Sequence, residues 1–387
     1  MTAPRSFDLA VVGAGIVGLA HAFAAARLGR RVVVIEREPR ATGASIRNFG
    51  FVTVTGQERG ATWRRARRSR DIWAAIAPAA GIAIEQKGLL VSLRHPLARA
   101  VAEAFLETEM GDGCDLLTPV EQAALPFPTD KLAGVLHSPH DVRVESRLAI
   151  PRLASWLHEA WGVTFQYGAA VLSASPPLVH TSRGSVEAEA VVVCPGDDLA
   201  TLFPERIAAH GVTRCTLSML RLADPGFRLP GAIMSDLGLV RYLGYAALPE
   251  AAALRAELGR SHADALADGV HLIVTQSADG TLVVGDSHHY GPAADPFMSA
   301  RVEGLILEAF REGLGMRPPA VVERWSGTYA SAEGTPMFVD APGPATRLVV
   351  VTSGTGASTA FAIGEEVIGS LYGHDLAAAP LTPTLAG

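Results

Sequence analysis

The feature that most constrains the fold of this chain is a glycine-rich turn at residues 13–18, which reads GAGIVG. It follows an apolar run at 8–12 and opens a segment, 16–28, in which Ala and Leu recur at helical spacing. A β-branched run at 32–35 then ends in Glu36. This order predicts a strand–helix–strand unit of a parallel sheet, and in that context a GxGxxG turn predicts a dinucleotide site.

Each glycine of the turn has its own physical role. The first allows the tight turn, the second lets a pyrophosphate approach the backbone, and the third lets the helix pack on the strand. The helix N-terminus supplies N–H donors and a positive dipole end to the phosphates. Glu36 lies 21 residues after Gly15, where its carboxylate is expected to accept hydrogen bonds from ribose hydroxyls. These features leave FAD and NAD equally open.

Length and composition narrow the class of protein. The 387 residues predict two or three compact units, because a domain takes about 150 residues. Charged residues make up only 19% of the chain and the net charge is −6, so we expect no nucleic-acid partner. The cysteines, Cys114, Cys194 and Cys215, form no CxxC pair, which argues against a zinc site and a disulfide framework and favours a reducing cytoplasm.

Two further patterns are interpreted as structural. Residues 9–26 are apolar enough to suggest a signal peptide, but their glycines fit the dinucleotide turn better, and no other run reaches the roughly 18 apolar residues of a membrane span. His137 and His140 flank Pro139 without further ligands nearby, so we assign them to a loop and predict no metal site.

Later segments repeat the α/β pattern and then interrupt it. A strand at 142–144 leads to a helix at about 147–161, and a buried strand at 191–193 ends in Cys194-Pro195-Gly196. From 215 to 338 the pattern changes to hairpin-like strands with one helix near 301–312. Two more helices are expected at 63–76, whose arginines form a solvated face, and at 358–372, after a strand at 348–352 and a glycine turn.

The segment after Glu36 favours FAD over NAD. Residues 42–50 form a long, polar, glycine-punctuated loop with no helix directly after the strand, as the wrap around a flavin requires. With the GxGxxG turn and Glu36-Arg37, this stretch resembles the D-amino-acid oxidase, glycine oxidase and sarcosine oxidase superfamily. The resemblance covers nearly the whole chain, because 191–196, Trp325 through Pro336, and 353–359 resemble later flavin contacts of that superfamily.

The resemblance implies an α/β fold with a Rossmann-like, glutathione-reductase-like FAD-binding domain and an inserted α+β substrate domain that contains a mostly antiparallel sheet. The FAD domain is expected at 1–85, 142–214 and 336–387, and the substrate domain at 86–141 and 215–335. Relatives with covalent FAD use a cysteine after the W-x-G segment, but no cysteine follows Cys215, so dissociable FAD is expected. The predicted cofactor residues are Gly13, Ala14, Gly15, Ile16, Val17, Gly18, Glu36, Arg37, Ala44, Ser45, Asn48, Phe49, Val171, Gly196, Gly354, Thr355, Gly356, Ala357, Ser358 and Thr359.

Within this superfamily, the stretches 45–50 and 285–291 resemble a bacterial branch associated with aminophosphonate breakdown. The branch acts on amines such as N-methylated 2-aminoethylphosphonate. Relatives that oxidise amino acids hold the substrate carboxylate with an arginine two residues after the glycine of W-x-G, but here that residue is Tyr329, so a bidentate clamp is missing. The candidate substrate ligands are Arg47, Arg241, Tyr242, His288 and Tyr329. For each of them, a purely structural role is the alternative.

The resemblance implies oxidation of a small amine by hydride transfer to flavin N5, followed by imine hydrolysis. Such a step needs no obligatory general base, only an amine held in its neutral form in a closed pocket. Oxidation of glycine, sarcosine or a D-amino acid is the alternative, and a non-catalytic FAD-binding subunit is the second. The sequence leaves open whether oxygen or another acceptor reoxidises the flavin.

Overall fold

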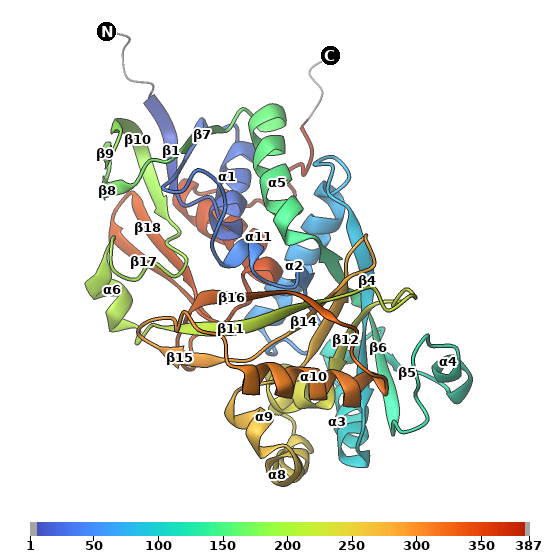
Figure 1. Cartoon of the computed structure of the whole chain (residues 1–387). Coiled ribbons are helices and arrows are strands. Elements are labelled where there is room, and N and C mark those ends of the chain that lie inside the picture. The colour runs from blue at the N-terminus through green and yellow to red at the C-terminus, as the bar shows by residue number, and fades with distance from the viewer. Residues whose placement is uncertain (1–5, 384–387) are drawn as a thin grey trace.

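The computed structural model describes residues 6–383, which form two β-sheets with helices around them (Figure 1). The first sheet has the strand order β17-β18-β10-β1-β2-β7, and a β8–β9 hairpin extends from β10. Its strands are β1 (Ser6–Val12), β2 (Val32–Glu36), β7 (Thr164–Tyr167), β8 (Val171–Ser175), β9 (Leu178–Thr181), β10 (Gly184–Val193), β17 (Met337–Gly343) and β18 (Thr346–Val351).

The four pairings that join β18, β10, β1, β2 and β7 are parallel, and only β17 and the hairpin run antiparallel. Alternate side chains along β1 enter different cores. Leu9 and Val11 pack with the helices on one face, whereas Ala10 packs with the residues on the other face. This burial on both faces explains why these strands are almost continuously apolar.

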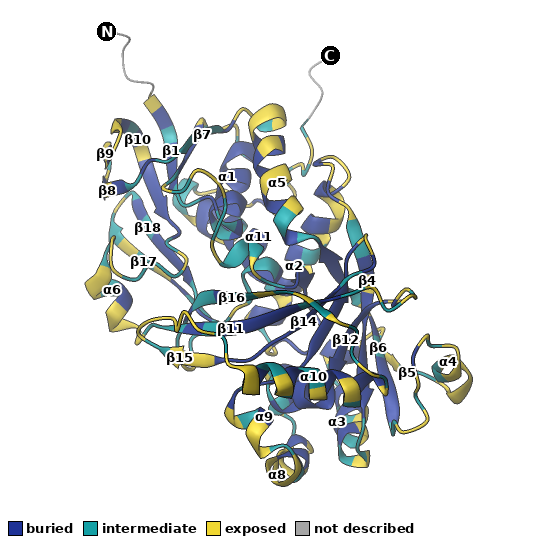
Figure 2. Cartoon of the chain, in the orientation of Figure 1, coloured by how far each residue is buried: buried dark blue, intermediate teal, exposed yellow. Residues whose placement is uncertain are grey.

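Three long helices cover one face of the first sheet: α1 (Ile16–Arg27), α5 (Ser146–Trp161) and α11 (Gly356–Tyr372). The backbones of α1 and α11 pack closely, since a Cβ at Gly364 would lie 2.8 Å from the carbonyl oxygen of Ala20. In Figure 2, α1 is coloured almost entirely as buried. The elements expected at 191–193, 348–352, 147–161 and 358–372 are confirmed as β10, β18, α5 and α11. The boundaries of β18, α5 and α11 differ from the expected ones by one or two residues, whereas β10 begins seven residues earlier, at Gly184.

The second sheet has the order β15-β11-β14-β13-β12-β4-β6-β3, with β16 also paired to β11 and β5 to β6. It is mostly antiparallel, as expected, and β12–β4 is its parallel pair. Its strands are β3 (Phe51–Val52), β4 (Ile84–Leu93), β5 (Asp115–Leu116), β6 (Gly134–Val144), β11 (Thr213–Leu222), β12 (Ala232–Ser235), β13 (Ile273–Gln276), β14 (Leu282–Gly285), β15 (His289–Gly291) and β16 (Val321–Ser331).

Other helices pack against this second sheet, and Figure 1 shows α3, α8, α9 and α10 below it. The remaining helical segments are α2 (Ala61–Ile76), α3 (Pro96–Leu106), α4 (Pro119–Ala123), α6 (Pro204–Ala209), α7 (Leu243–Ala246), α8 (Ala251–Ser261), α9 (Ala263–Ala267) and α10 (Ala300–Leu314), with 3₁₀ turns η1 (Ala44–Ile46), η2 (Glu109–Gly111) and η3 (Asp236–Val240). The helices expected at 63–76 and 301–312 are confirmed as α2 and α10.

Three details of the sequence interpretation are wrong. Residues 142–144 end β6 of the second sheet rather than opening a new βα unit, because β6 pairs antiparallel with β3 and β4. The region 215–338 holds more than the one helix expected. The helical spacing of the buried residues Ala251, Leu254 and Leu258 could have predicted α8 from sequence. The arginine face of α2 is partly paired with α11, because Arg65 and Arg68 bind acidic residues there.

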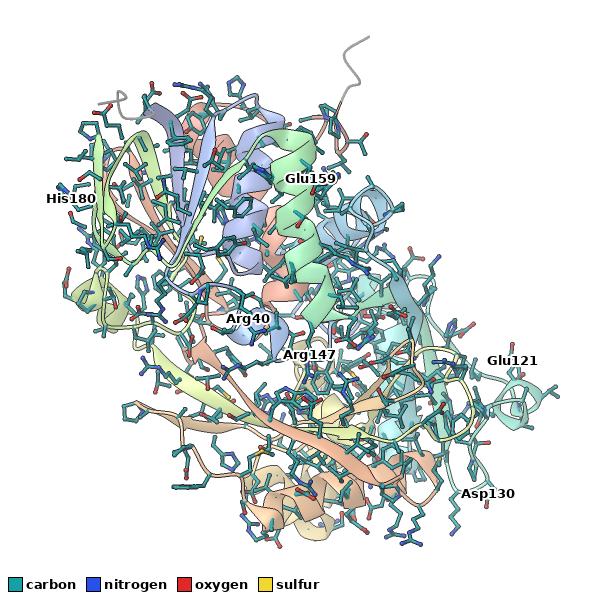
Figure 3. All side chains as sticks on the ribbon, turned by 45° about the horizontal axis from the view of Figure 1, so that its top comes forward. Arg40, Glu121, Asp130, Arg147, Glu159 and His180 are labelled. Carbon is teal, nitrogen blue, oxygen red and sulfur yellow. The ribbon has the colours of Figure 1, made fainter. Side chains whose placement is uncertain are left out.

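Links between the two sheets position the site. Arg147 lies at the end of α5 that faces the second sheet (Figure 3), and it forms an ion pair of 2.9 Å with Glu323 of β16. The guanidinium of Arg147 also lies over the ring of Trp325. At the other end of β16, Ser331 bridges to Ser353, just after β18. The second sheet therefore attaches beside the carboxyl ends of the parallel strands.

Candidate active site

Three glycine turns meet at one edge of the first sheet. β1, β10 and β18 are neighbours and run parallel, so their carboxyl ends lie together. The turns that follow them contain Gly13, Gly196 and Gly354, all with positive φ. Ligands of open α/β sheets bind at the carboxyl ends of the strands, where the strand order reverses. The sheet topology thus brings together turns that are more than 150 residues apart in sequence.

The first turn has room only for glycine at two positions. A Cβ at Gly18 would lie 1.9 Å from the carbonyl oxygen of Gly13, which is too close for any side chain. At Gly13 itself, φ is +103° and a Cβ would lie 2.5 Å from the carbonyl oxygen of Cys194. Gly15 is less restricted, because its nearest neighbour would be the hydroxyl of Ser45 at 3.0 Å. The space above Gly15 is therefore open to a ligand.

Two helix N-termini border this space. Gly15 is the N-cap of α1 and Thr355 is the N-cap of α11, and neither makes a side-chain capping hydrogen bond. The backbone N–H of Ile16 donates to the hydroxyl of Ser45 at 2.9 Å. Helix N-termini offer N–H donors and a partial positive charge to anions, so this pair suits a phosphate-containing ligand.

Glu36 lies beside the glycine turn at the end of β2. Its carboxylate accepts a hydrogen bond from the N–H of Ala14 at 2.8 Å and another from the N–H of Glu38 at 2.9 Å. Each carboxylate oxygen keeps a second lone pair for a ribose hydroxyl. Arg37 forms an ion pair with Asp198 at 2.7 Å. The ribose role of Glu36 stays a prediction.

The loop predicted to wrap around the cofactor is held by its own hydrogen bonds. The amide of Asn48 donates to the carbonyl of Ala44 at 2.8 Å, and its oxygen accepts hydrogen bonds from Gly50 N–H and the Ser146 hydroxyl, both at 2.7 Å. The indole N–H of Trp325 donates to the carbonyl of Arg47 at 3.2 Å. As the sequence indicated, no helix directly follows β2, and only the short η1 interrupts the loop.

A cavity of about 490 Å³ runs from these turns to the second sheet. Most of the predicted cofactor residues line it: Gly15, Ile16, Val17, Gly18, Ala44, Ser45, Asn48, Phe49, Gly196, Gly354, Thr355, Gly356, Ala357 and Ser358. The others do not form its wall, and they are Gly13, Ala14, Glu36, Arg37, Val171 and Thr359. The five predicted substrate ligands, Arg47, Arg241, Tyr242, His288 and Tyr329, all line the same cavity.

The polar groups at the far end of the cavity come mainly from the second sheet. Arg241 is half-buried, and its guanidinium donates to the hydroxyl of Tyr290 at 3.1 Å. Arg241 does not lie on a strand, because it directly follows the turn η3 and precedes α7. Arg47 is exposed at the cavity rim. Burial raises the pKa of Tyr242 and that of Tyr329, so both hydroxyls stay protonated.

Two residues of this wall, His271 and Asp286, were missed by the sequence analysis. Nδ1 of His271 lies 3.3 Å from Oδ1 of Asp286, and Nε2 of His288 lies 3.8 Å from Oδ2 of Asp286. All three residues are buried. Asp286 stands inside the stretch 285–291, which the resemblance had marked, whereas His271 carried no signal in sequence. Within residues 6–383 these three form a group whose residue types could bind a metal ion.

Burial determines the charge of this group. It raises the pKa of Asp286 to about 7, although the guanidinium of Arg241 opposes the shift. Burial and Arg241 together hold the pKa values of His271 and His288 well below the usual range of histidine. Both imidazoles are therefore neutral near pH 7. Arg241 is the permanent charge among these four residues.

Neither His137 nor His140 reaches the cavity wall, and the loop interpretation of both is wrong, because they lie on β6. The ring of His137 lies 3.1 Å from a carboxylate oxygen of Asp115, and Nε2 of His140 donates to the carbonyl of Asp112. His137 therefore contacts the first residue of β5, and His140 contacts the segment before it.

Comparison with known proteins agrees with this geometry. A family model described as "DAO: FAD dependent oxidoreductase" matches residues 8–369. The chain belongs to this family. The match includes both sheets and all three glycine turns, so the resemblance seen at 13–18 and 42–50 extends over the whole site.

The chain is also similar to individual members of known activity. It is 29% identical over 261 residues to a D-amino acid dehydrogenase 2 from Mesorhizobium japonicum, and the alignment covers 50% of this chain and 62% of that protein. Glycine oxidase from Geobacillus kaustophilus has a similar structure, with a TM-score of 0.75 and 19% sequence identity. The match covers 99% of this chain and 100% of that protein. L-proline dehydrogenase from P. horikoshii has a TM-score of 0.76 and 18% sequence identity. The match covers 98% of this chain and 96% of that protein. These likenesses show the fold.

The residues present fit FAD, the cofactor of this family. The glycine turn has no room for side chains at Gly13 and Gly18 and leaves the space above Gly15 open, and two helix N-termini have no side-chain cap. Cys194 lines the cavity, but burial raises the pKa of its thiol, so it stays protonated. Across residues 6–383, no helix is both long and apolar enough to cross a membrane.

Proposed function

We propose that this protein oxidises the carbon–nitrogen bond of a small amine, and that its substrate is an aminoalkylphosphonate such as N-methylated 2-aminoethylphosphonate. Hydrolysis of the resulting imine would give phosphonoacetaldehyde. Bound FAD supplies the hydride acceptor for this oxidation. The protein holds the amine in the cavity, orients its C–H bond and excludes water.

The observation that carries this proposal is the identity of residue 329. In amino-acid-oxidising relatives this position holds the substrate carboxylate with an arginine, but here Tyr329 lines the cavity with a protonated hydroxyl. The cation of the cavity comes instead from Arg241, on the turn after η3. Because this cation comes from a different part of the chain, the cavity lacks the carboxylate clamp of those relatives, which supports a substrate with another anionic group.

The donors around Arg241 suit a phosphonate. Its guanidinium has five N–H donors, of which one contacts Tyr290, and the hydroxyls of Tyr242 and Tyr329 lie on the same cavity wall. A phosphonate has three oxygens and up to two negative charges, so several charge-assisted donors bind it better than one. Arg47 at the rim adds a second cation. The resemblance of 45–50 and 285–291 to the aminophosphonate branch supports the same choice.

Oxidation of glycine, sarcosine or a D-amino acid is the second candidate. The similarity to a D-amino acid dehydrogenase and to the fold of a glycine oxidase favours it. In that case Arg241 would bind the carboxylate in place of the missing arginine at 329. Either oxygen or another acceptor is compatible with both candidates.

Anaerobic reduction of the flavin by a matched panel tests the proposal. The panel contains N-methyl-2-aminoethylphosphonate, 2-aminoethylphosphonate, sarcosine, glycine, D-alanine and the uncharged N-methylpropylamine. We expect N-methyl-2-aminoethylphosphonate to bleach the flavin fastest. If sarcosine, glycine or D-alanine reduces the flavin faster, the second candidate function replaces the aminophosphonate proposal. A flavin that stays oxidised with every amine would indicate a non-catalytic FAD-binding subunit.

A further inference from the structure

The carboxylate of Asp286 lies on the cavity wall, and one of its oxygens is buried without a hydrogen bond, 3.3 Å from Nδ1 of His271. Oδ1 of Asp286 makes no hydrogen bond to any described residue, and the same holds for its neighbour Nδ1 of His271. Asp286 is 4% exposed and follows β14, whereas His271 precedes β13. A buried polar atom without a partner costs free energy, so its retention on a cavity wall indicates a ligand.

We propose that Asp286 is the amine subsite of this cavity: its carboxylate receives the protonated amino group of the substrate and accepts one proton from it. In this step one N–H bond breaks and one O–H bond forms on Asp286. The electron pair of the N–H bond stays on nitrogen, and no other bond changes. The amine is then neutral, which is the form from which a hydride can leave. The inference deepens the proposed function and rests on it, because it needs an amine substrate.

The groups around Asp286 suit this exchange. His271 and His288 face it from the loops before β13 and after β14, and both are neutral near pH 7. Arg241 and Tyr242 face it from the turn after η3, and Arg241 favours the ionised carboxylate. The thiol of Cys215 on β11 is also near enough to interact with it, but burial raises the pKa of that thiol to about 11.

The cavity therefore offers one anion and one cation to the same ligand. Asp286 matches an ammonium group and Arg241 matches an anionic group, which is the charge pattern of a small zwitterion. Because burial penalises the charged carboxyl, Asp286 has a stronger affinity for a proton than an exposed aspartate. A group with this affinity takes a proton from an ammonium ion more readily.

A divalent metal ion is the rival occupant, because two histidines and a carboxylate are common metal ligands. The charge of Arg241 disfavours it. Arg241 lowers the pKa values of both histidines and of Asp286, so its field reaches all three ligand positions. A metal ion would keep its two positive charges next to this guanidinium, whereas an amine loses its charge to Asp286.

Proton counting on a ligand that cannot be oxidised tests the subsite. (2-Amino-2-methylpropyl)phosphonate has no hydrogen on the carbon that bears nitrogen, and propylphosphonate lacks the amine. Binding of both to the FAD-loaded protein is measured by calorimetry in two buffers of different ionisation enthalpy. The pH is about 9, which lies above the pKa of Asp286 and below that of an alkylammonium group, about 10.4.

The wild-type protein should bind the aminophosphonate with no net proton release, because the proton moves to Asp286. Asp286→Asn should release about one proton per amine or bind it about 10- to 100-fold more weakly, since a hydrogen bond to a charged group is lost. Propylphosphonate should bind Asp286→Asn at least as tightly as the wild type, because the variant removes an anion that interacts with Arg241. Asp268→Asn, which removes a carboxylate paired with Arg301 and His289 away from the cavity wall, should behave as wild type.

Equal proton release and equal affinity in wild type and Asp286→Asn would overturn the inference. So would one divalent metal ion per purified chain whose removal by a chelator abolishes binding of the aminophosphonate. The result does not depend on turnover. If the proton counts differ as expected but no amine reduces the flavin, only the proposed function fails; if amines reduce the flavin while the counts are equal, only the subsite fails.

Discussion

Tyr329 on β16 and Gly354 after β18 are in direct contact, so that a Cβ at position 354 would lie 3.1 Å from Cζ of the tyrosine ring. Tyr329 lies in the second sheet and Gly354 in the turn that follows β18 of the first sheet, and both line the cavity. The turn expected to contact the cofactor therefore also positions the side chain of Tyr329, a proposed substrate ligand.

This contact predicts that Gly354→Ala impairs both stability and catalysis. The backbone at Gly354 has φ of +70°, where a Cβ costs about 1–2 kcal/mol, and the new methyl group would displace Tyr329. Gly373→Ala is the matched control, because Gly373 has the same φ with nothing within 4 Å of the added atom. Both variants should lose stability in thermal unfolding, Gly354→Ala more because Tyr329 must also move, and only Gly354→Ala should slow flavin reduction. Equal reduction rates would mean that Tyr329 needs no positioning.

Gly15→Val should abolish FAD binding and leave a folded protein. The backbone at Gly15 is extended, with φ of −73° and ψ of 173°, so a side chain fits the backbone but occupies the space above the turn. Gly43→Val is the control, since an added Cβ meets nothing within 4 Å there. Flavin absorbance and the circular dichroism of the purified variants measure both effects. Full flavin occupancy in Gly15→Val would contradict the assignment of this turn.

FAD should leave the protein on acid precipitation. No cysteine follows residue 215, and burial raises the pKa values of the thiols of Cys114, Cys194 and Cys215, so these side chains stay protonated and unreactive near neutral pH. The absorbance of supernatant and pellet measures the outcome. Yellow colour that remains in the washed pellet would show a covalent bond.

Arg241→Ala should weaken anionic substrates selectively. Removing a buried donor from a bound anion costs about 2–5 kcal/mol, so the Kd of N-methyl-2-aminoethylphosphonate should rise by more than tenfold. N-methylpropylamine, which lacks the anion, should be affected much less. Arg47→Ala is the comparison, because Arg47 is exposed at the rim and its charge is screened by solvent. An equal loss for both amines would assign Arg241 a structural role.

Asp286→Asn should stabilise the fold at neutral and alkaline pH. The folded-state pKa of Asp286, about 7, lies above its ordinary value of 3.8, so the folded protein binds the proton more tightly than the unfolded chain. Wild-type stability therefore falls as pH rises from about 4 to 7, and the loss then persists. Denaturant unfolding at about pH 5 and pH 8 should show a larger advantage of the variant at pH 8. A constant difference would contradict the raised pKa.

The nucleotide-binding end of the site could be predicted from sequence because its signals are local. The turn at 13–18 and Glu36 lie within one strand–helix–strand unit, where steric limits on glycine and the run of β-branched residues are visible in order. The strands before Gly196 and Gly354 carried the same kind of signal. Their adjacency follows once all three belong to one parallel sheet.

The substrate end was decided by tertiary structure. Asp286, His271 and Arg241 come from separate loops of the second sheet, and of the three only Arg241 was a candidate ligand from sequence. Only the packing of β13, β14 and η3 around one cavity removes water from them, and that desolvation is what shifts the Asp286 pKa upward and keeps the histidines neutral. Local sequence determines backbone conformation over a few residues, whereas desolvation depends on all the atoms that surround a group, so only the folded chain could decide it.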